Sequence, residues 1–210
     1  MTKKRILCFG DSNTWGYIPG KGERYEEEIR WTGILAHCLG EDYRVIEEGL
    51  NGRTTVFSDL IEPERCGITH LRPVILSQLP LDYMIIMLGT NDTKTHFHVN
   101  AMEIGYGMEE VLIKARHILE IQGSKARIIL VAPPQIHPSG DPMFNRESEE
   151  KSLELSGIYR ELAEKWDCCF FDAESVTGEP GEDGIHMTEE SHRVLGKELA
   201  EIIKGMEEKK

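Results

Sequence analysis

Residues 5–12 read Arg5-Ile6-Leu7-Cys8-Phe9-Gly10-Asp11-Ser12, a short apolar run that stops at a glycine, a carboxylate and a hydroxyl. An apolar run of this length, bounded by a turn signal, is typical of a buried β-strand. Open α/β sheets build their sites at the carboxyl ends of their strands. The stretch therefore predicts a buried strand with chemically useful side chains directly behind it.

Four more apolar runs alternate with segments of helical periodicity. The predicted strands are 5–9, 43–46, 83–88, 127–131 and 168–171, and the predicted helices are 31–39, 69–79, 101–121, 147–166 and 189–204. Asn100 and Thr188 precede two of these helices and are expected to cap them. This alternation predicts an α/β fold of three layers, α/β/α, with a flavodoxin-like five-stranded parallel sheet, in which residues 1–210 form a single domain.

The charge and the amino-terminal segment bear on partners and location. A formal charge of -13 disfavours nucleic acid and anionic membrane surfaces as partners. The segment behind Met1 is basic, but the apolar run breaks at Gly10-Asp11, too early for a signal peptide or a membrane span. The five cysteines are an odd set without CxxC spacing and are expected to be reduced thiols. The sequence thus favours a cytoplasmic protein.

Ser12 is a candidate nucleophile, although a serine after a strand also has an ordinary role as a helix cap. A nucleophilic serine needs a base, and the base needs an acceptor on its second ring nitrogen. Asp183 and His186 lie three residues apart in Asp183-Gly184-Ile185-His186, just before a predicted helix. The spacing allows the carboxylate to orient the imidazole towards the serine, although on its own this fragment better fits a surface acid and a histidine at a helix terminus.

An acyl-transfer site also needs hydrogen-bond donors for the developing oxyanion. Asn91 offers a side-chain amide behind the third strand, Gly52 an unobstructed backbone N–H behind the second, and Ser12 its own N–H. Each residue has a simpler explanation as part of a turn. Those explanations leave open why donors, nucleophile and base all follow strands at one edge of the sheet.

Four ordered blocks of the sequence resemble those of the SGNH hydrolases, the GDSL-type esterase and lipase superfamily. The blocks are Gly10-Asp11-Ser12, Gly49-Leu50-Asn51-Gly52, Gly89-Thr90-Asn91-Asp92 and Asp183-Gly184-Ile185-His186. The segments Arg30-Trp31-Thr32-Gly33 and Phe171-Asp172-Ala173 resemble the arylesterase and acyltransferase branch more closely. The chain differs from the usual family pattern at Asn13, where leucine often follows the serine.

The resemblance implies a serine esterase that forms an acyl-enzyme intermediate on Ser12. It implies His186 as general base, Asp183 as the orienting carboxylate, and an oxyanion hole made by Ser12, Gly52 and Asn91, with no metal and no organic cofactor. The expected substrates are short-chain, acetyl-type esters, with acyl transfer to alcohols as a second outcome.

The pocket walls and the partner molecules are less determined by sequence. Trp15, Phe97 and Ile185 are predicted to contact the substrate, because Trp15 follows the Ser12 block, Phe97 follows the Asn91 block and Ile185 lies beside His186. A small-molecule acyl ester is the expected partner. Acidic charge keeps molecules apart, but the proline-rich segment 132–146 offers an arm, so a homo-oligomer is favoured.

Two other functions stay open at this stage. A carbohydrate O-deacetylase of the same superfamily would use the same residues on acetylated sugars. A flavodoxin-like phosphate- or nucleotide-binding module would use the loop after the first strand to hold phosphate. The second alternative places Asp11 next to a phosphate and gives Asn91 and His186 no task.

Overall fold

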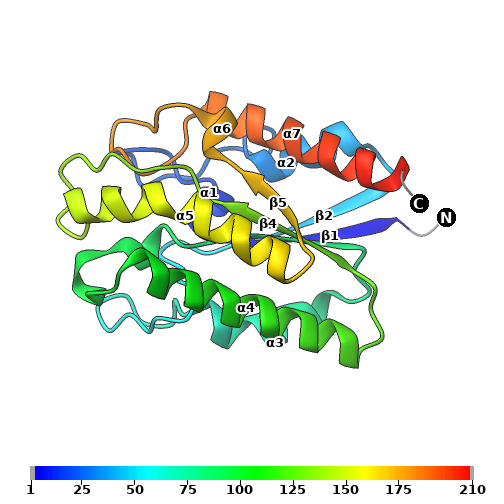
Figure 1. Ribbon diagram of the computed structural model, residues 1–210. Helices are drawn as coiled ribbons and strands as arrows, with labels where there is room; N and C mark the ends of the chain where they lie inside the picture. Colours follow the sequence, from blue (N-terminus) through cyan, green and yellow to red (C-terminus); the bar gives the residue numbers. More distant parts are fainter. Residues whose placement is uncertain (1–2, 209–210) are drawn as a thin grey trace.

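A five-stranded parallel sheet lies between two layers of helices in the computed structural model, which describes residues 3–208 (Figure 1). The strands are β1 (Lys4–Gly10), β2 (Tyr43–Gly49), β3 (Tyr83–Met87), β4 (Arg127–Ala132) and β5 (Cys169–Asp172). Every neighbouring pair is parallel, and the strand order is β2-β1-β3-β4-β5. This is the flavodoxin-like order, so the predicted fold class is confirmed.

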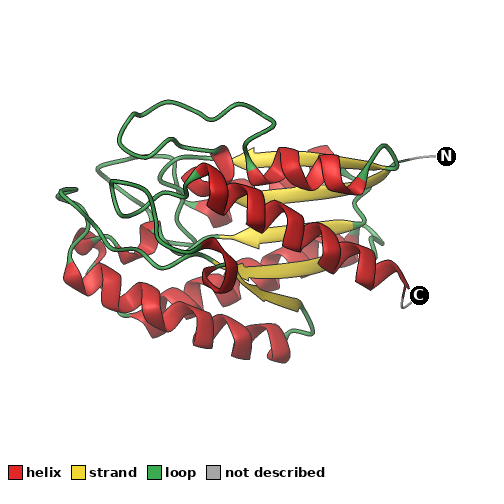
Figure 2. Ribbon diagram, turned by 90° about the horizontal axis from the view of Figure 1, so that it is seen from above, coloured by secondary structure: helices red, strands yellow, loops and turns green. Residues whose placement is uncertain are grey.

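The helices connect the strands and cover both faces of the sheet (Figure 2). They are α1 (Ser12–Trp15), α2 (Trp31–Leu39), α3 (Gly67–Gln78), α4 (Ala101–Ile121), α5 (Arg146–Lys165), α6 (Glu174–Thr177) and α7 (Glu189–Glu208), with 3-10 turns η1 (Asn91–Thr93) and η2 (Thr95–Phe97). Helices α3, α4 and α5 lie on one face, and α2 and α7 on the other (Figure 1). The short helices α1 and α6 were not predicted.

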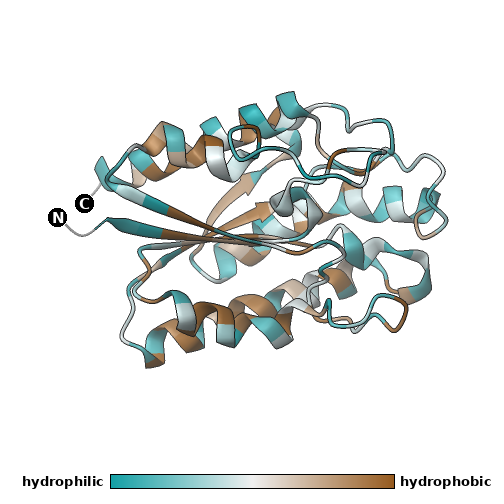
Figure 3. Cartoon of the chain, turned by 180° about the vertical axis from the view of Figure 1, so that it is seen from behind, coloured by the Kyte–Doolittle hydropathy of each residue, from teal (hydrophilic) through white to brown (hydrophobic). Residues whose placement is uncertain are grey.

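Alternation along the central strands produces two separate cores. In β1, Leu7 packs into the core beneath α3, α4 and α5, whereas Ile6 and Cys8 pack beneath α2 and α7. All five residues of β3 are buried. The buried apolar residues of the helices pack against the sheet, and Figure 3 shows hydrophobic positions along the helices and strands between the two layers. Burial on both faces explains why these strands read as continuous apolar runs.

The strand order reverses direction between β1 and β3, and this reversal determines where the candidate site lies. From β1 the chain moves outwards to β2 and then crosses back to β3 on the other side. The loops behind β1 and β3 therefore leave in opposite directions, and open α/β sheets bind ligands at such a switch point. Ser12 follows β1 and Asn91 follows β3, so both lie at this switch point.

The expected caps are present. Asn100 accepts from Glu103 N at 3.0 Å and forms a capping box at the start of α4. Thr188 Oγ1 accepts from Ser191 N at 3.2 Å at the start of α7. The last helix begins where predicted and continues four residues further, to Glu208. No helix among residues 3–208 combines the length and the apolar character that crossing a membrane requires.

Candidate active site

Ser12 is the first residue of α1, and its neighbour Asp11 caps that helix. The Asp11 carboxylate accepts from Asn13 N at 2.9 Å. Ser12 therefore does not cap the helix that follows the first strand, and its hydroxyl is available for another partner. Ser12 is 5% exposed and lies at the start of the helical turn directly behind β1.

Ser12, His186 and Asp183 form a continuous hydrogen-bonded chain. Ser12 Oγ lies 3.0 Å from His186 Nε2, and His186 Nδ1 lies 2.8 Å from Asp183 Oδ2. Asp183 Oδ1 also accepts from the backbone N–H of Ile185 and of His186, at 2.9 Å each. The fold thus brings the predicted nucleophile, base and orienting carboxylate together, although Ser12 and His186 are 174 positions apart in sequence.

Hydrogen bonds to Asp183 keep its carboxylate charged. Burial raises the pKa of Asp183, but the hydrogen bonds from the His186 ring and from the backbone N–H of His186 and Ile185 outweigh it. The pKa therefore lies well below that of an ordinary aspartate. A permanently ionised acceptor fixes the proton on Nδ1 and leaves Nε2 as the lone-pair nitrogen that faces Ser12.

The two predicted oxyanion donors outside α1 lie in tight turns. Gly52 adopts φ +76°, and a Cβ at this position would approach the Glu62 carboxylate to 3.2 Å, so a side chain is disfavoured there. Asn91 starts η1, is 6% exposed, and donates one amide hydrogen to Arg53 O at 3.2 Å. The amide carries a second hydrogen, which is the one available to an oxyanion.

Replacing Asn91 with alanine is expected to lower kcat for p-nitrophenyl acetate by about 10²- to 10³-fold, with a smaller change in KM, because a donor to the oxyanion acts mainly in the transition state. Steady-state kinetics measure the effect. Asn100→Ala, which removes an asparagine that caps α4, is the matched control and should keep wild-type kcat. A kcat of Asn91→Ala within threefold of wild type would exclude Asn91 as a donor.

Tyr17 contacts the ring of His186, and Arg53 binds the backbone just before Ser12. The Tyr17 ring stacks on the His186 ring with a centroid distance of 4.1 Å and an interplanar angle of 27°. Arg53 is 4% exposed; its Nη1 donates to Gly10 O at 2.7 Å, and its guanidinium lies 4.2 Å from the centre of the Phe9 ring. Burial lowers the pKa of Arg53 to about 10. No sequence pattern marks Arg53, because an arginine that is buried in a turn has the same sequence surroundings as one on the surface.

The three residues predicted to contact substrate lie in different surroundings. Trp15 and Phe97 are partly exposed, with the Trp15 ring 6.4 Å from that of Tyr17 and the Phe97 ring 5.9 Å from that of Phe57. Ile185 is only 5% exposed and belongs to a small apolar cluster. The cluster consists of Ile136, Phe144 and Ile185, with Met143 packed against it. Substrate contact by the three residues stays a prediction.

Two buried carboxyl groups lie beneath the site. Burial raises the pKa of Asp11 to about 6, while the hydrogen bond from Asn13 and the charges of His186 and Arg53 limit the rise. Burial, with a contribution from Asp11, raises the pKa of Asp92 to about 7 against the hydrogen bonds that it accepts from Thr55. Both groups bind a proton more tightly in the folded than in the unfolded chain.

Stability is expected to fall with rising pH because of Asp92. A raised carboxyl pKa favours folding at pH below the unfolded value of 3.8, and this contribution is lost as pH rises towards about 7. Asp92→Asn removes the titration, so its free energy of unfolding relative to wild type should increase from about pH 5 to about pH 8. Urea unfolding at both pH values tests this. The exposed Asp42→Asn is the control, and a pH-independent difference for Asp92→Asn would contradict the prediction.

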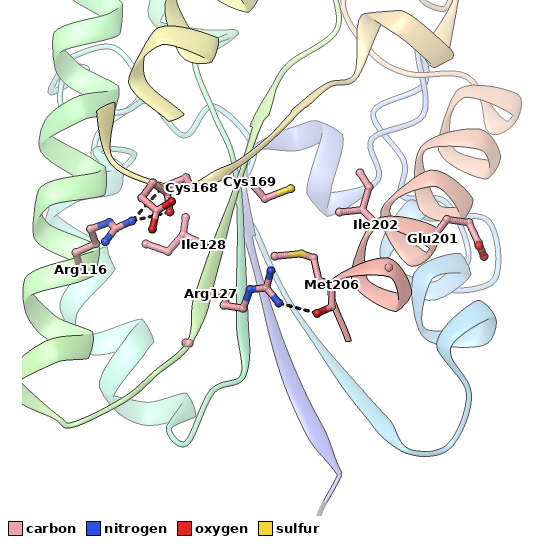
Figure 4. A pocket seen from close by; sticks show the side chains of 11 residues that line it. Arg116, Arg127, Ile128, Cys168, Cys169, Glu201, Ile202 and Met206 are labelled. Carbon is pink, nitrogen blue, oxygen red and sulfur yellow. Dashed lines mark hydrogen bonds between the residues drawn. The ribbon is translucent and has the colours of Figure 1, made fainter. Parts of the chain in front are cut away.

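A cavity of about 680 Å³ lies at the opposite end of the sheet (Figure 4). It is bounded by the starts of β4 and β5 and by the last turn of α7, where Arg127 Nη1 donates to Met206 O at 2.9 Å. The residues that line it include none of the candidate site residues.

Over residues 3–208, no three His, Cys, Asp or Glu side chains are grouped as ligands for a metal ion.

Comparison with known proteins places this site in a family. The sequence profile of the GDSL-like lipase/acylhydrolase family matches residues 8–194. Est24, described as a carbohydrate acetylesterase from Sinorhizobium meliloti, is 41% identical, with a TM-score of 0.92 over 97% of this chain and 100% of its own. The aryl esterase of M. smegmatis is 40% identical, with a TM-score of 0.90 over 96% of this chain and 99% of its own.

A second carbohydrate acetylesterase family member from Sinorhizobium meliloti is 35% identical, with a TM-score of 0.87 over 97% of this chain and 98% of its own. No curated protein sequence is a significant match. The family profile covers the segments that carry Ser12, Gly52, Asn91 and His186, and the structural matches span nearly whole chains. The resemblance noted from four sequence blocks is therefore confirmed, and the chain belongs to the GDSL-like lipase/acylhydrolase family.

Proposed function

We propose that this chain, a carboxylic ester hydrolase of its family, cleaves short-chain acyl esters with Ser12 as the nucleophile. One observation carries the proposal: Ser12 Oγ, His186 and Asp183 are linked by hydrogen bonds of 3.0 and 2.8 Å at the carboxyl end of the sheet. A serine activated in this way, next to amide donors, is the arrangement that acyl transfer requires.

The reaction proceeds in two halves. His186 Nε2 removes the proton of Ser12 Oγ as the oxygen attacks the ester carbonyl, and Asp183 stabilises the imidazolium that results. The backbone N–H groups of Ser12 and Gly52 and the Asn91 amide stabilise the tetrahedral oxyanion. His186 then gives its proton to the departing alcohol, which leaves an acyl-enzyme. Water, activated by the same histidine, attacks the acyl group and restores the free serine.

Acyl transfer to an alcohol would follow the same route. The alcohol replaces water in the second half of the reaction, and His186 takes its proton, so the product is a new ester. No further group is needed for this step. Ester product formed in water from p-nitrophenyl acetate and a primary alcohol would demonstrate it.

The acyl group is expected to be small. Two of the similar structures are described as carbohydrate acetylesterases and one as an aryl esterase, and these descriptions support an acetyl-type acyl group. Release of p-nitrophenol from the acetyl, butyryl and octanoyl esters tests the proposal. The acetyl ester should give the highest kcat/KM and the octanoyl ester the lowest. A preference for octanoate would instead indicate a lipase-like enzyme.

Deacetylation of carbohydrates is the second candidate function. It is favoured by the two carbohydrate acetylesterases at 41% and 35% identity. Acetate release from acetylated xylan and from an acetylated monosaccharide, compared with release from p-nitrophenyl acetate, separates the two. A higher kcat/KM on the acetylated sugars would assign the enzyme to this class, whereas activity on the aryl ester alone would keep it an arylesterase.

A further inference from the structure

The side chain of Asn13 connects the nucleophile turn to the loop that carries His186. Asn13 is the second residue of α1 and is only 2% exposed. Its Oδ1 accepts a hydrogen bond from Met187 N at 2.9 Å. Met187 directly follows His186, and it is also buried, at 2% exposure. The contact therefore spans two segments that are 174 residues apart in sequence.

This bond runs beside the contact between the two reacting side chains. Ser12 Oγ meets His186 Nε2 at 3.0 Å, and the next residue of each segment forms the second bond, between Asn13 and Met187. The first bond must change during the reaction because its proton moves. The second joins a backbone N–H to an amide oxygen, and neither of these groups gains or loses a proton in the reaction.

Both ends of the second bond are buried, and the Asn13 end is also held by Asp11. Asp11 accepts from Asn13 N at 2.9 Å, which holds the backbone of the asparagine in the helical turn. Met187 N is a buried backbone donor, and such donors are nearly always paired in folded proteins. A leucine at position 13 offers no acceptor, so the Met187 N–H would lose its partner.

We propose that Asn13 is a positioning residue, which holds His186 within hydrogen-bond distance of Ser12 through its bond to Met187 N. This inference rests on the proposed serine esterase mechanism. It gives a function to the asparagine that directly follows the nucleophile. Displacement of a catalytic base by about 1 Å can lower the rate by roughly a hundredfold.

Asn13→Leu tests the proposal. It keeps the side-chain volume but removes the acceptor, so kcat for p-nitrophenyl acetate should fall by about 10²-fold while KM changes less than threefold. Asn13→Asp retains an acceptor oxygen, so its kcat should be at least tenfold higher than that of Asn13→Leu. Asn100→Leu, which removes a comparable side-chain bond to a backbone N–H at the start of α4, is the control and should keep wild-type kcat.

A spectroscopic signature separates positioning from a general loss of stability. The proton between His186 Nδ1 and Asp183 should give a low-field proton resonance in wild type, and in Asn13→Leu this resonance should broaden or shift although thermal unfolding remains cooperative. If Asn13→Leu does not fold, the same resonance is measured in Asn13→Asp. This variant keeps the acceptor for Met187 N, so the proposal predicts a resonance like that of wild type.

The outcomes also distinguish this inference from the proposed function. A folded Asn13→Leu with kcat within threefold of wild type and an unchanged resonance overturns the role of Asn13 and leaves the mechanism standing. Ester turnover by wild type that persists in Ser12→Ala overturns the mechanism itself, and with it the inference.

Discussion

Replacing Ser12 with alanine is expected to lower kcat for p-nitrophenyl acetate by about 10⁴- to 10⁶-fold. The hydroxyl oxygen is the only heavy atom that is lost, and it is the atom that lies 3.0 Å from His186 Nε2. Without it no acyl-enzyme forms on this residue, and only the stabilisation of the oxyanion in a direct attack by water remains. A burst-free, nearly background release of p-nitrophenol is the expected measurement.

The Ser12→Ala variant should fold normally, since alanine fits a helical position and removes no buried cap. Circular dichroism and thermal unfolding check this. Ser77→Ala, at an exposed position of α3, is the matched control and should retain full turnover. Turnover by Ser12→Ala above about one per cent of wild type would require a different nucleophile.

The exchange of Asp183 for asparagine is expected to lower kcat by about 10⁴-fold. Oδ1 of Asp183 accepts from two backbone N–H groups, so an asparagine must place its carbonyl oxygen there. Its NH₂ group then faces His186 Nδ1, which must accept rather than donate. The ring proton moves to Nε2, and the nitrogen next to Ser12 can no longer take the proton of the serine.

The tautomer argument can be checked without kinetics. The low-field resonance of the His186 Nδ1 proton should be absent from Asp183→Asn but present in Asp82→Asn, a control at the amino-terminal end of the sheet, where Asp82 accepts from Arg5 N. A loss of kcat smaller than about tenfold would show that Asp183 does not orient the base.

Much of the fold could be predicted because buried parallel strands have an unmistakable composition. The stretch Tyr83–Met87 is apolar throughout and is buried throughout. The last strand starts at Cys169 rather than at Cys168, because Cys168 N still bonds to Ala163 O at the end of α5. A local exit from a helix of this kind depends on the tertiary structure and leaves no pattern in the sequence.

Candidate site residues could be predicted where the residue type indicates a chemical role and the residue directly follows a predicted strand or precedes a predicted helix. Ser12, Asn91 and the Asp183-His186 pair meet that description, and the structure brings them to one edge of the sheet. Asn13 and Arg53 do not meet it, because each is distinguished by a hydrogen bond to a residue far away in sequence. Contacts between segments distant along the chain are set by packing, which residue spacing does not encode.

Covalent labelling tests the central claim most directly. The protein is incubated with diethyl p-nitrophenyl phosphate, residual esterase activity is followed, and the modified residue is located by peptide mass spectrometry. The account predicts that loss of activity parallels the appearance of one diethylphosphoryl group on the peptide that contains Ser12, and that Ser12→Ala gains none. Complete inactivation with the group on another residue, or full esterase activity in protein labelled at Ser12, would contradict it.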